Sequence, residues 1–356
     1  MTPPIWDVFC RVIDNHGDVG VCWRLARALA ARGVAVRLWI DDASALVWMA
    51  PAGHPGVQVL PWPEQPMAVT PGDVVIEAFG CELPAHVMAS MAACQPAPVW
   101  INLEYLSAED YVERSHQLRS PQWHGPAAGL TKWFFYPGFT PRTGGLLHDL
   151  AAGKAAAALP DEAIARTGEQ VINVFCYRDA GLKAVLNACA AGRPTLLRAL
   201  PGPAQAQLAT QAWPPGHRCL ALPHLSQPDF DCLLACADLN IVRGEDSFVR
   251  AQLQADAPFL WHIYPQDDGA HAAKLDAFLA RYLDGAEPGL GSCVAGWFRA
   301  LNGLGPTPVQ WPDVPAWRAH HGRWRQGLLA QPDLCTQLMR FAAHQAARIG
   351  ISADPG

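Results

Sequence analysis

The sequence has little charge, and its acidic residues outnumber its basic ones. Only 16% of the 356 residues are charged, and 26 lysines and arginines against 32 aspartates and glutamates leave a formal net charge of −6. A protein that binds nucleic acid through a general basic field needs the opposite balance. We therefore expect no nucleic-acid partner, although a local pocket for one nucleotide fits this composition.

Cysteine pairs at redox or metal-binding spacing are absent. The chain has 11 cysteines, an odd number, and none of them forms a CxxC motif. Most lie in apolar runs, where a free cysteine packs as a small hydrophobic residue. Cys232 and Cys236 are four residues apart and share a helix face, which favours a core role over a metal site. This usage favours a reducing compartment and predicts no structural zinc.

The sequence also lacks targeting and membrane-spanning segments. Its first ten residues, MTPPIWDVFC, have neither the basic start nor the apolar run of a signal peptide. No stretch approaches the roughly 20 uninterrupted apolar residues that a transmembrane helix needs. We therefore expect a cytoplasmic protein without a membrane partner.

Apolar residues are plentiful and recur with the rhythm of alternating strands and helices. They make up 51% of the chain, which is enough material for two hydrophobic cores. Residues 5–13 are typical of a buried strand, residues 19–33 have helical spacing that ends at Gly33, and residues 34–41 form the next strand. This βαβ unit predicts a parallel sheet.

The same rhythm occurs twice along the chain. Further strands are predicted at residues 56–62, 73–79, 97–106, 170–177, 195–200, 218–225, 236–245 and 257–266. Residues 268–283 and 331–350 have helical periodicity, whereas residues 119–145, rich in aromatic and turn residues, read as surface loops. The pattern predicts an α/β protein with two similar domains around a cleft.

The loop after the first strand carries acids where a phosphate-binding loop would carry none. The stretch VIDNHGDVGVCWRLARAL, residues 12–29, has the glycines of a strand–loop–helix turn but also contains Asp14 and Asp18. It lacks the GxGxxG motif, and its carboxylates would repel a pyrophosphate, which argues against a dinucleotide oxidoreductase. A structural alternative has Asp14 shaping a turn beside Asn15 and Asp18 capping the helix.

A second strand end carries residues suited to a nucleotide-sugar. In LNIVRGEDSFVRAQL, residues 239–253, a strand runs into Arg243, and a helix follows with Asp246 or Ser247 as its N-cap. The N–H groups of such a helix start bind phosphate, and the Ser247 hydroxyl adds a donor. Glu245 and Asp246 suit sugar hydroxyls. The alternative is a capped helix with an Arg–Glu surface pair.

Several aromatic and imidazole side chains have both a functional and a structural interpretation. Phe175 and Tyr177 lie two residues apart and share one face of a strand, where they stack on a base or join the core. His320 and His321 form an adjacent pair, but neighbouring residues on a helix point in different directions. We therefore expect this pair to lie on a solvated surface.

Five blocks of the sequence are long and unusual. They are FCRVIDNHGDVGVCWRLARAL, INLEYLSAEDYVE, FFYPGFTPRTGGLL, RGEDSFVRAQ and WHIYPQDDGAHAAKLDAFL. Together, and in this order over nearly the whole chain, they resemble one family, the bacterial protein-arginine rhamnosyltransferases that modify elongation factor P (the EarP family).

The resemblance implies a fold and a reaction. The fold is GT-B, with two Rossmann-like domains facing across a central cleft. Residues 1–160 would bind the acceptor, residues 161–332 would bind the nucleotide-sugar, and a C-terminal helix at about 333–350 would pack back on the first domain. The enzyme would transfer L-rhamnose from TDP-β-L-rhamnose, with inversion and without a metal or other cofactor. The acceptor would be one arginine of elongation factor P, activated to rescue ribosomes stalled at polyproline.

The resemblance also assigns roles to individual residues. Asp18 matches the catalytic aspartate, Asp14 a second acid of the same loop, and Glu245 an essential glutamate. The implied donor-binding residues are Phe175, Tyr177, His224, Gln227, Arg243, Asp246 and Ser247. His224 departs from the family, in which phenylalanine is expected, but an imidazole can also stack on a base.

Two acids in one loop suit an arginine acceptor. A guanidinium stays protonated at physiological pH and is a poor nucleophile. A carboxylate can pair with the planar guanidinium and accept the proton that it sheds as the bond to the sugar forms. We therefore expect Asp18 to act as the general base or to orient the guanidinium, and Asp14 to help align it.

Two other functions remain compatible with these residues. One is a GT-B glycosyltransferase with a different acceptor, such as a lipid-linked saccharide; a membrane-contact stretch would favour it, and the sequence contains none. The other is a protein that binds a nucleotide-sugar without turnover, for which replacing Asp18 would have no effect on any product.

Overall fold

A computed structural model gives the fold of the chain. It describes residues 3–13, 16–65, 70–148, 168–178, 181–191, 193–211, 213 and 215–352. The predicted second acid, Asp14, and the predicted domain boundary at residue 160 lie outside these described residues.

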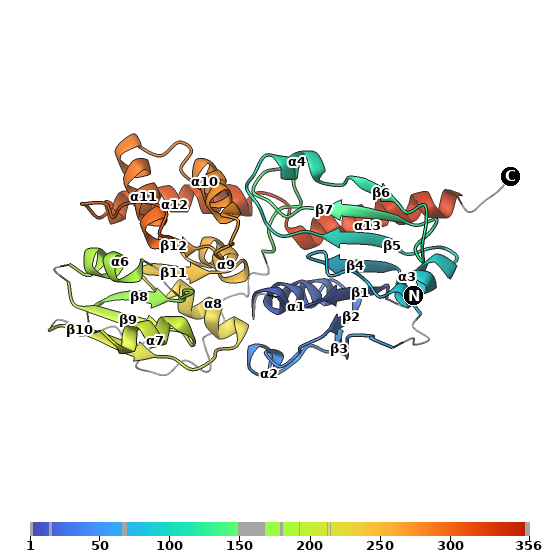
Figure 1. Cartoon of the computed structure of the whole chain (residues 1–356), viewed down its shortest axis with the longest axis horizontal. Helices are drawn as coiled ribbons and strands as arrows, with labels where there is room; N and C mark the ends of the chain where they lie inside the picture. Colours follow the sequence, from blue (N-terminus) through green and yellow to red (C-terminus); the bar gives the residue numbers. More distant parts are fainter. Residues whose placement is uncertain are drawn as a thin grey trace. The chain divides into compact units, whose positions relative to one another are not determined.

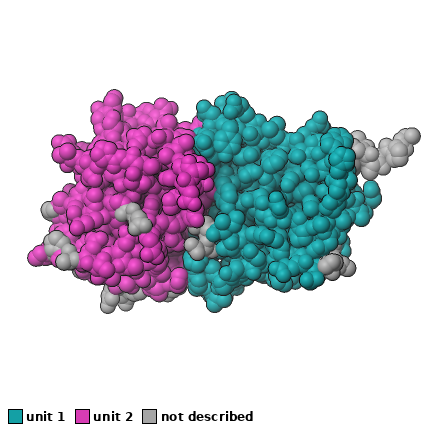
Figure 2. Space-filling model, viewed as in Figure 1, with its two compact units in different colours: residues 1–149, 331–356 teal, residues 150–330 magenta. Residues whose placement is uncertain are grey.

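The chain forms two compact units, which Figure 2 colours separately. The first comprises Met1–Asp149 and Gln331–Gly356, and the second comprises Leu150–Ala330. Each unit is built around its own sheet. Among the described residues, no helix has the length and apolar character that a transmembrane span requires.

The described part of the first unit contains a seven-stranded sheet in the order β3-β2-β1-β4-β5-β7-β6 (Figure 1). The strands are β1 (Ile5–Cys10), β2 (Ala35–Ile40), β3 (Val57–Pro61), β4 (Val74–Ala78), β5 (Val99–Leu103), β6 (Arg119–Pro121) and β7 (Thr131–Phe135). All neighbours are parallel except β6 and β7. The chain winds from β1 to β3 on one side and restarts with β4 on the other, which makes the β1–β4 junction a topological switch point. Open α/β sheets bind ligands at such points, beyond the carboxyl ends of the strands.

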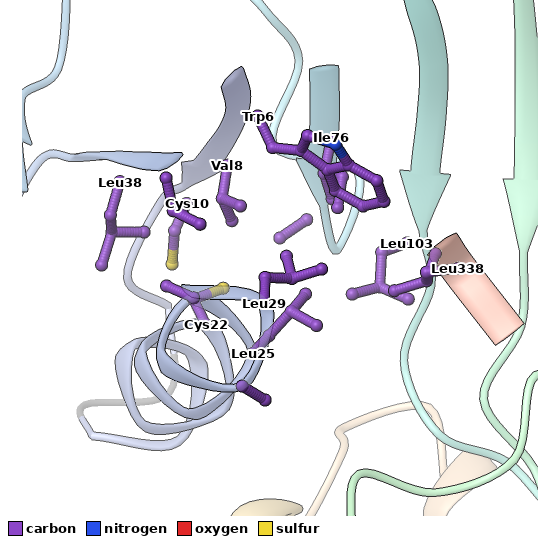
Figure 3. Packing of buried hydrophobic residues seen from close by; sticks show 14 of the residues in the cluster. Trp6, Val8, Cys10, Cys22, Leu25, Leu29, Leu38, Ile76, Leu103 and Leu338 are labelled. Carbon is purple, nitrogen blue, oxygen red and sulfur yellow. The ribbon is translucent and has the colours of Figure 1, made fainter. Parts of the chain in front are cut away.

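Helices cover both faces of this sheet. They are α1 (Gly17–Ala30), α2 (Leu46–Met49), α3 (Ala85–Ala93), α4 (Tyr111–Ser115) and α13 (Leu334–Ser352). On one face, Cys22, Leu25 and Leu29 of α1 pack against Val8 and its neighbours, because one side of the α1 sequence is continuously apolar (Figure 3). On the other face, α3 packs against the alternate side chains of the same strands.

The C-terminal helix α13 belongs to this first core. Leu338 and Phe341 of α13 are buried in the cluster that also contains Leu103 of β5. Just before the helix starts, Asp333 accepts a hydrogen bond of 2.6 Å from Arg32, beyond the end of α1. Leu334 N–H also donates to the carbonyl of Leu146. Helix α13 is therefore part of the first unit, the one that carries Asp18.

The second unit has a five-stranded sheet in its described part, in the order β10-β9-β8-β11-β12, with all neighbours parallel. The strands are β8 (Gln170–Val174), β9 (Thr195–Ala199), β10 (His217–Ala221), β11 (Leu239–Arg243) and β12 (Phe259–His262). The helices are α6 (Leu182–Cys189), α7 (Pro203–Ala209), α8 (Gln227–Ala235), α9 (Asp246–Gln254), α10 (Ala270–Tyr282), α11 (Pro288–Leu301) and α12 (Val314–Leu329). The winding reverses between β8 and β11, so this unit has its own switch point.

The interpretation of residues 119–145 as loops is wrong in part. This segment contains the edge pair β6 and β7, and Ser120 lies opposite Lys132 in the antiparallel ladder. The sequence pattern for a strand is weak here because β6 has only three residues and ends in Pro121. Strands tolerate proline at a sheet edge.

Candidate functional site

Asp18 lies at the switch point of the first unit, one residue into α1. It follows the loop that leaves β1, and its side chain is only 2% exposed. The structural alternative, in which Asp18 caps the helix, is wrong. His16 occupies the N-cap position, and no side-chain hydrogen bond caps this helix end. Asp18 lies instead in the first turn of α1, at the carboxyl edge of the sheet.

Hydrogen-bond donors reach both oxygens of the Asp18 carboxylate. The backbone N–H of Ile13 donates to Oδ2 at 2.8 Å, and the Tyr105 hydroxyl donates to Oδ1 at 3.2 Å. The Tyr105 ring stacks on Phe79, with centroids 4.4 Å apart and planes 12° apart. Phe79 follows β4 with a left-handed backbone (φ 58°), and Tyr105 follows β5. The segments that follow β1, β4 and β5 thus converge on one carboxylate.

The turn between β11 and α9 is closed by Ser247. The Ser247 hydroxyl accepts a hydrogen bond of 3.1 Å from the backbone N–H of Arg243 and donates to the carbonyl of the same residue. Gly244 has φ 61°, a conformation that favours glycine. Glu245, rather than Asp246 or Ser247, occupies the N-cap position, without a side-chain capping bond. The predicted N-cap is therefore wrong, and the Ser247 hydroxyl faces the turn.

Arg243 covers the two aromatic residues that follow β8. Its guanidinium carbon lies 4.3 Å from the centroid of the Phe175 ring and 4.8 Å from that of Tyr177. The prediction that these rings share a face is confirmed, because one guanidinium contacts both. A planar cation over two rings forms a rigid, positively charged surface beside the start of α9.

His262 supports this surface from β12. Its Nδ1 accepts a hydrogen bond of 3.0 Å from the backbone N–H of Tyr177, so the ring proton sits on Nε2. Burial, and secondarily the charges of Arg243 and His271, lower the pKa of His262 to about 4. The imidazole is therefore neutral at neutral pH and adds no charge to the surface. The ring of Tyr264, which is 48% exposed, meets Tyr177 edge-on.

The remaining predicted donor residues lie at the start of α8. Gln227 is the first residue of this helix and is buried, while His224 in the preceding loop is exposed. Ser226 caps the helix by accepting from the N–H of Asp229, and its hydroxyl donates to the Asp229 carboxylate at 2.5 Å. The starts of α8 and α9 thus both lie at the carboxyl edge of the second sheet.

The prediction that His320 and His321 lie on a solvated surface is wrong. Both are buried: His320 Nε2 lies 2.6 Å from the Tyr282 carbonyl and His321 Nε2 lies 3.1 Å from the Ala255 carbonyl. These are structural contacts of α12 with the core of the second unit. Outside the gaps in the described ranges, no three His, Cys, Asp or Glu side chains form a group that could hold a metal ion.

Sequence reasoning missed Tyr105. It placed His262 beside a loop that could touch the sugar, with a buried structural role as the alternative, and the structure shows His262 buried. Tyr105 is 87 residues from Asp18 in the sequence, and only the sheet topology brings the two together. Its one sequence signal is its place directly after a buried strand, at the edge where ligands bind. His262 lies at the same edge of the second sheet, next to the strand that bears Arg243.

Comparisons with known proteins identify the family of the chain. Residues 6–343 match the family model described as elongation-factor P (EF-P) rhamnosyltransferase EarP. A protein-arginine rhamnosyltransferase of Pseudomonas putida is 42% identical, with 94% of this chain and 98% of that protein covered. One of Neisseria meningitidis serogroup B is 36% identical, with 98% and 100% covered.

Similarity to two solved structures identifies the fold. A structure described as the basis for EarP-mediated arginine glycosylation of translation elongation factor EF-P matches with a TM-score of 0.59 and 28% identity, covering 96% of this chain and 99% of that chain. Spinosyn Rhamnosyltransferase SpnG matches with a TM-score of 0.56 and 16% identity, covering 96% and 100%. The two Rossmann-like units therefore have the GT-B fold, and the chain belongs to the EarP family of elongation-factor-P rhamnosyltransferases.

Proposed function

We propose that this protein transfers L-rhamnose from TDP-β-L-rhamnose to a single arginine side chain of elongation factor P. Its family membership and the names of its relatives support this assignment. The observation that carries it is the Asp18 carboxylate, buried and held on both oxygens at the switch point of the first unit. A fixed carboxylate at that place suits a guanidinium acceptor and repels a phosphate donor.

In this proposal Asp18 receives the proton of the acceptor. A guanidinium nitrogen attacks the anomeric carbon of rhamnose, and the bond from that carbon to the diphosphate oxygen breaks. The nitrogen proton passes to Asp18, and TDP leaves with the bonding electron pair. A single displacement of this kind inverts the anomeric centre. Asp14, which lies outside the described residues, would pair with the same guanidinium and align it.

The second unit would hold the donor. The first-turn N–H groups of α9 and the Arg243 guanidinium face the negative charge that develops on the leaving diphosphate. Glu245, at the N-cap, would bind rhamnose hydroxyls or stabilise the positive charge that grows on the ring. Because the Ser247 hydroxyl already donates to the Arg243 carbonyl, we assign Ser247 to the shape of this turn.

The base and the pentose of TDP would lie among the remaining predicted donor-binding residues. Phe175 and Tyr177 support the Arg243 guanidinium, and the segment from His224 to Gln227 borders the start of α8. Asp246, half-buried in the first turn of α9, suits a hydroxyl group rather than a phosphate oxygen. The reaction would need no metal, because fixed cationic and N–H groups offset the diphosphate charge.

The proposed acceptor also indicates where and why the protein acts. A translation factor is modified in the cytoplasm, the compartment that the cysteine usage predicts. The modified factor would rescue ribosomes stalled at polyproline. No nucleic acid takes part in the transfer itself.

Intact mass spectrometry tests the proposal directly. Purified elongation factor P is incubated with this protein and TDP-β-L-rhamnose, and the product is digested and mapped. We expect one added deoxyhexose on one arginine, and none when that arginine is replaced by lysine. Donor hydrolysis without any mass gain would mean that the acceptor is a different molecule. Binding without either reaction would mean that the protein is not an enzyme.

A further inference from the structure

A buried ion pair joins the two helices that begin at the proposed donor site. Arg250 of α9 donates to the Asp231 carboxylate of α8 twice, from Nε to Oδ1 at 3.1 Å and from Nη2 to Oδ2 at 3.0 Å. The side chains are only 1% and 4% exposed. Two parallel bonds fix both the distance and the angle between the partners, which a single bond does not.

Each partner lies one helical turn inside the donor edge. Asp231 comes four residues after Gln227, the first residue of α8, and Arg250 comes four residues after Asp246, the first residue of α9. Four residues advance a helix by about 6 Å, and residues four apart share a helix face. The pair therefore links the two helices about one turn beneath their starts.

Stability alone is a weak reason for such a pair. Removing two charges from water costs about as much as their attraction returns, and apolar residues of similar size often replace buried pairs without loss. A better-supported role for such a pair is to fix the geometry between two helix ends that bind a ligand. The Ser226–Asp229 cap at the start of α8 and the Ser247 turn at the start of α9 hold each end locally, but neither bond connects the two helices.

We propose that Asp231 and Arg250 are positioning residues for the donor: they hold the starts of α8 and α9 in the register that lets both ends bind the same nucleoside diphosphate. This inference rests on the proposed function, because it takes the starts of these helices as the donor site. Neither residue touches the substrate in this scheme. Both act through the spacing between Gln227 and the first turn of α9.

The test measures TDP affinity by isothermal titration calorimetry together with thermal stability. The double variant Asp231→Leu with Arg250→Met replaces the pair by apolar side chains of similar size. We expect its melting temperature to be no lower than that of the wild type and its dissociation constant for TDP to rise at least tenfold. A dissociation constant within twofold of the wild-type value in the folded variant would overturn the proposal.

A conservative variant covers the case in which the double variant does not fold. Arg250→Lys keeps the charge but cannot make two parallel bonds. We expect TDP to bind at least threefold more weakly, the KM for the donor to rise by the same factor, and the KM for elongation factor P to stay unchanged. A purely structural role would lower the melting temperature and leave the dissociation constant for TDP unchanged, and that result would contradict the proposal.

The Asp7–Arg37 pair of the first unit is the matched control. Arg37 donates to both carboxylate oxygens of Asp7 at 2.6 Å, and Asp7 is 1% exposed. The double variant Asp7→Asn with Arg37→Gln should leave TDP affinity unchanged, even where it lowers stability. Because TDP binding needs no acceptor, the test holds even if elongation factor P is the wrong substrate. If the wild-type protein does not bind TDP, the inference and the donor assignment are both wrong.

Discussion

The hydroxyl of Tyr105 donates a hydrogen bond to Asp18 Oδ1 at 3.2 Å, while the ring of the same tyrosine stacks on Phe79. Asp18 comes from the loop and helix after β1, and Tyr105 comes from the end of β5. The stack orients the phenol, and the phenol orients the carboxylate. The proposed base is thus held by the strand ends of its own sheet as well as by its own loop.

Replacing Tyr105 by phenylalanine tests this relationship. The variant keeps the ring and its stack on Phe79 but loses the hydrogen bond to a charged group, an interaction of about 1.5–3 kcal/mol. We expect kcat for rhamnosylation to fall about 10- to 100-fold and the KM for TDP-β-L-rhamnose to stay constant, as steady-state kinetics would measure. Equal kcat values for variant and wild type would show that the Tyr105 hydroxyl does not orient Asp18 for catalysis.

Glu245→Gln tests the assignment of Glu245 to the sugar. Because this residue is proposed to contact rhamnose, calorimetry should give the same affinity for TDP, which lacks the sugar, and weaker binding of TDP-β-L-rhamnose. Transfer should fall by about 100-fold or more, since a carboxylate opposite a growing positive charge acts mainly in the transition state. A variant that binds TDP itself more weakly would place Glu245 at the diphosphate instead.

Arg243→Lys separates the charge of this residue from its planar shape. Lysine keeps the cation but cannot cover Phe175 and Tyr177 together, and a desolvated cation–π contact contributes about 2 kcal/mol. We expect TDP to bind about tenfold or more weakly. Arg218→Lys, in the pair with Glu169 at the sheet edge, is the control that should leave TDP affinity unchanged.

The free energy of unfolding should decrease as the pH is lowered, because His321 is buried. Burial lowers the pKa of His321 from the ordinary 6.5 to about 4. Below pH 6.5 the unfolded chain takes up a proton that the folded protein refuses, so this contribution is complete above 6.5 and is lost as the pH falls toward 4. Between pH 7 and 5 the loss is about 2 kcal/mol.

Urea unfolding at these two pH values checks this prediction. His321→Gln, which cannot take up a proton, should reduce the pH-dependent loss of unfolding free energy. His124→Gln, at an exposed histidine, should leave that loss as it is in the wild type. If the unfolding free energy of His321→Gln decreases between pH 7 and 5 as much as that of the wild type, another group causes the decrease.

The sequence predicts the regular parts of this fold because their signals are local. Apolar runs such as those around Val8 and Ile241 give the strands, and the one-sided pattern around Leu25 gives α1. Local capping rules fail where tertiary contacts take over. Ser247 bonds back to Arg243 instead of capping α9, and the segment with β6 and β7 shows no clear periodicity.

The candidate site is predictable only in its strand-end residues. Asp18 and Glu245 follow buried strands, Arg243 is the last residue of one, and that position reveals them. Tyr105 and the Asp231–Arg250 pair depend on contacts between elements that are separate in the sequence. His321 has the same origin, because its burial comes from the packing of α12 on the aromatic core of the second unit and not from its own helix pattern.

The most direct test of the whole account is Asp18→Asn, measured for both transfer and TDP binding. Asparagine keeps one oxygen that can accept from the Ile13 N–H, its amide N–H can donate to the Tyr105 hydroxyl, and it carries no negative charge. We predict that rhamnosylation of elongation factor P, followed by intact mass, slows by about 10²- to 10⁴-fold, while the dissociation constant for TDP stays within twofold of the wild-type value. Transfer at the wild-type rate would show that the arginine proton goes elsewhere, and the assignment of Asp18 to the acceptor would be wrong.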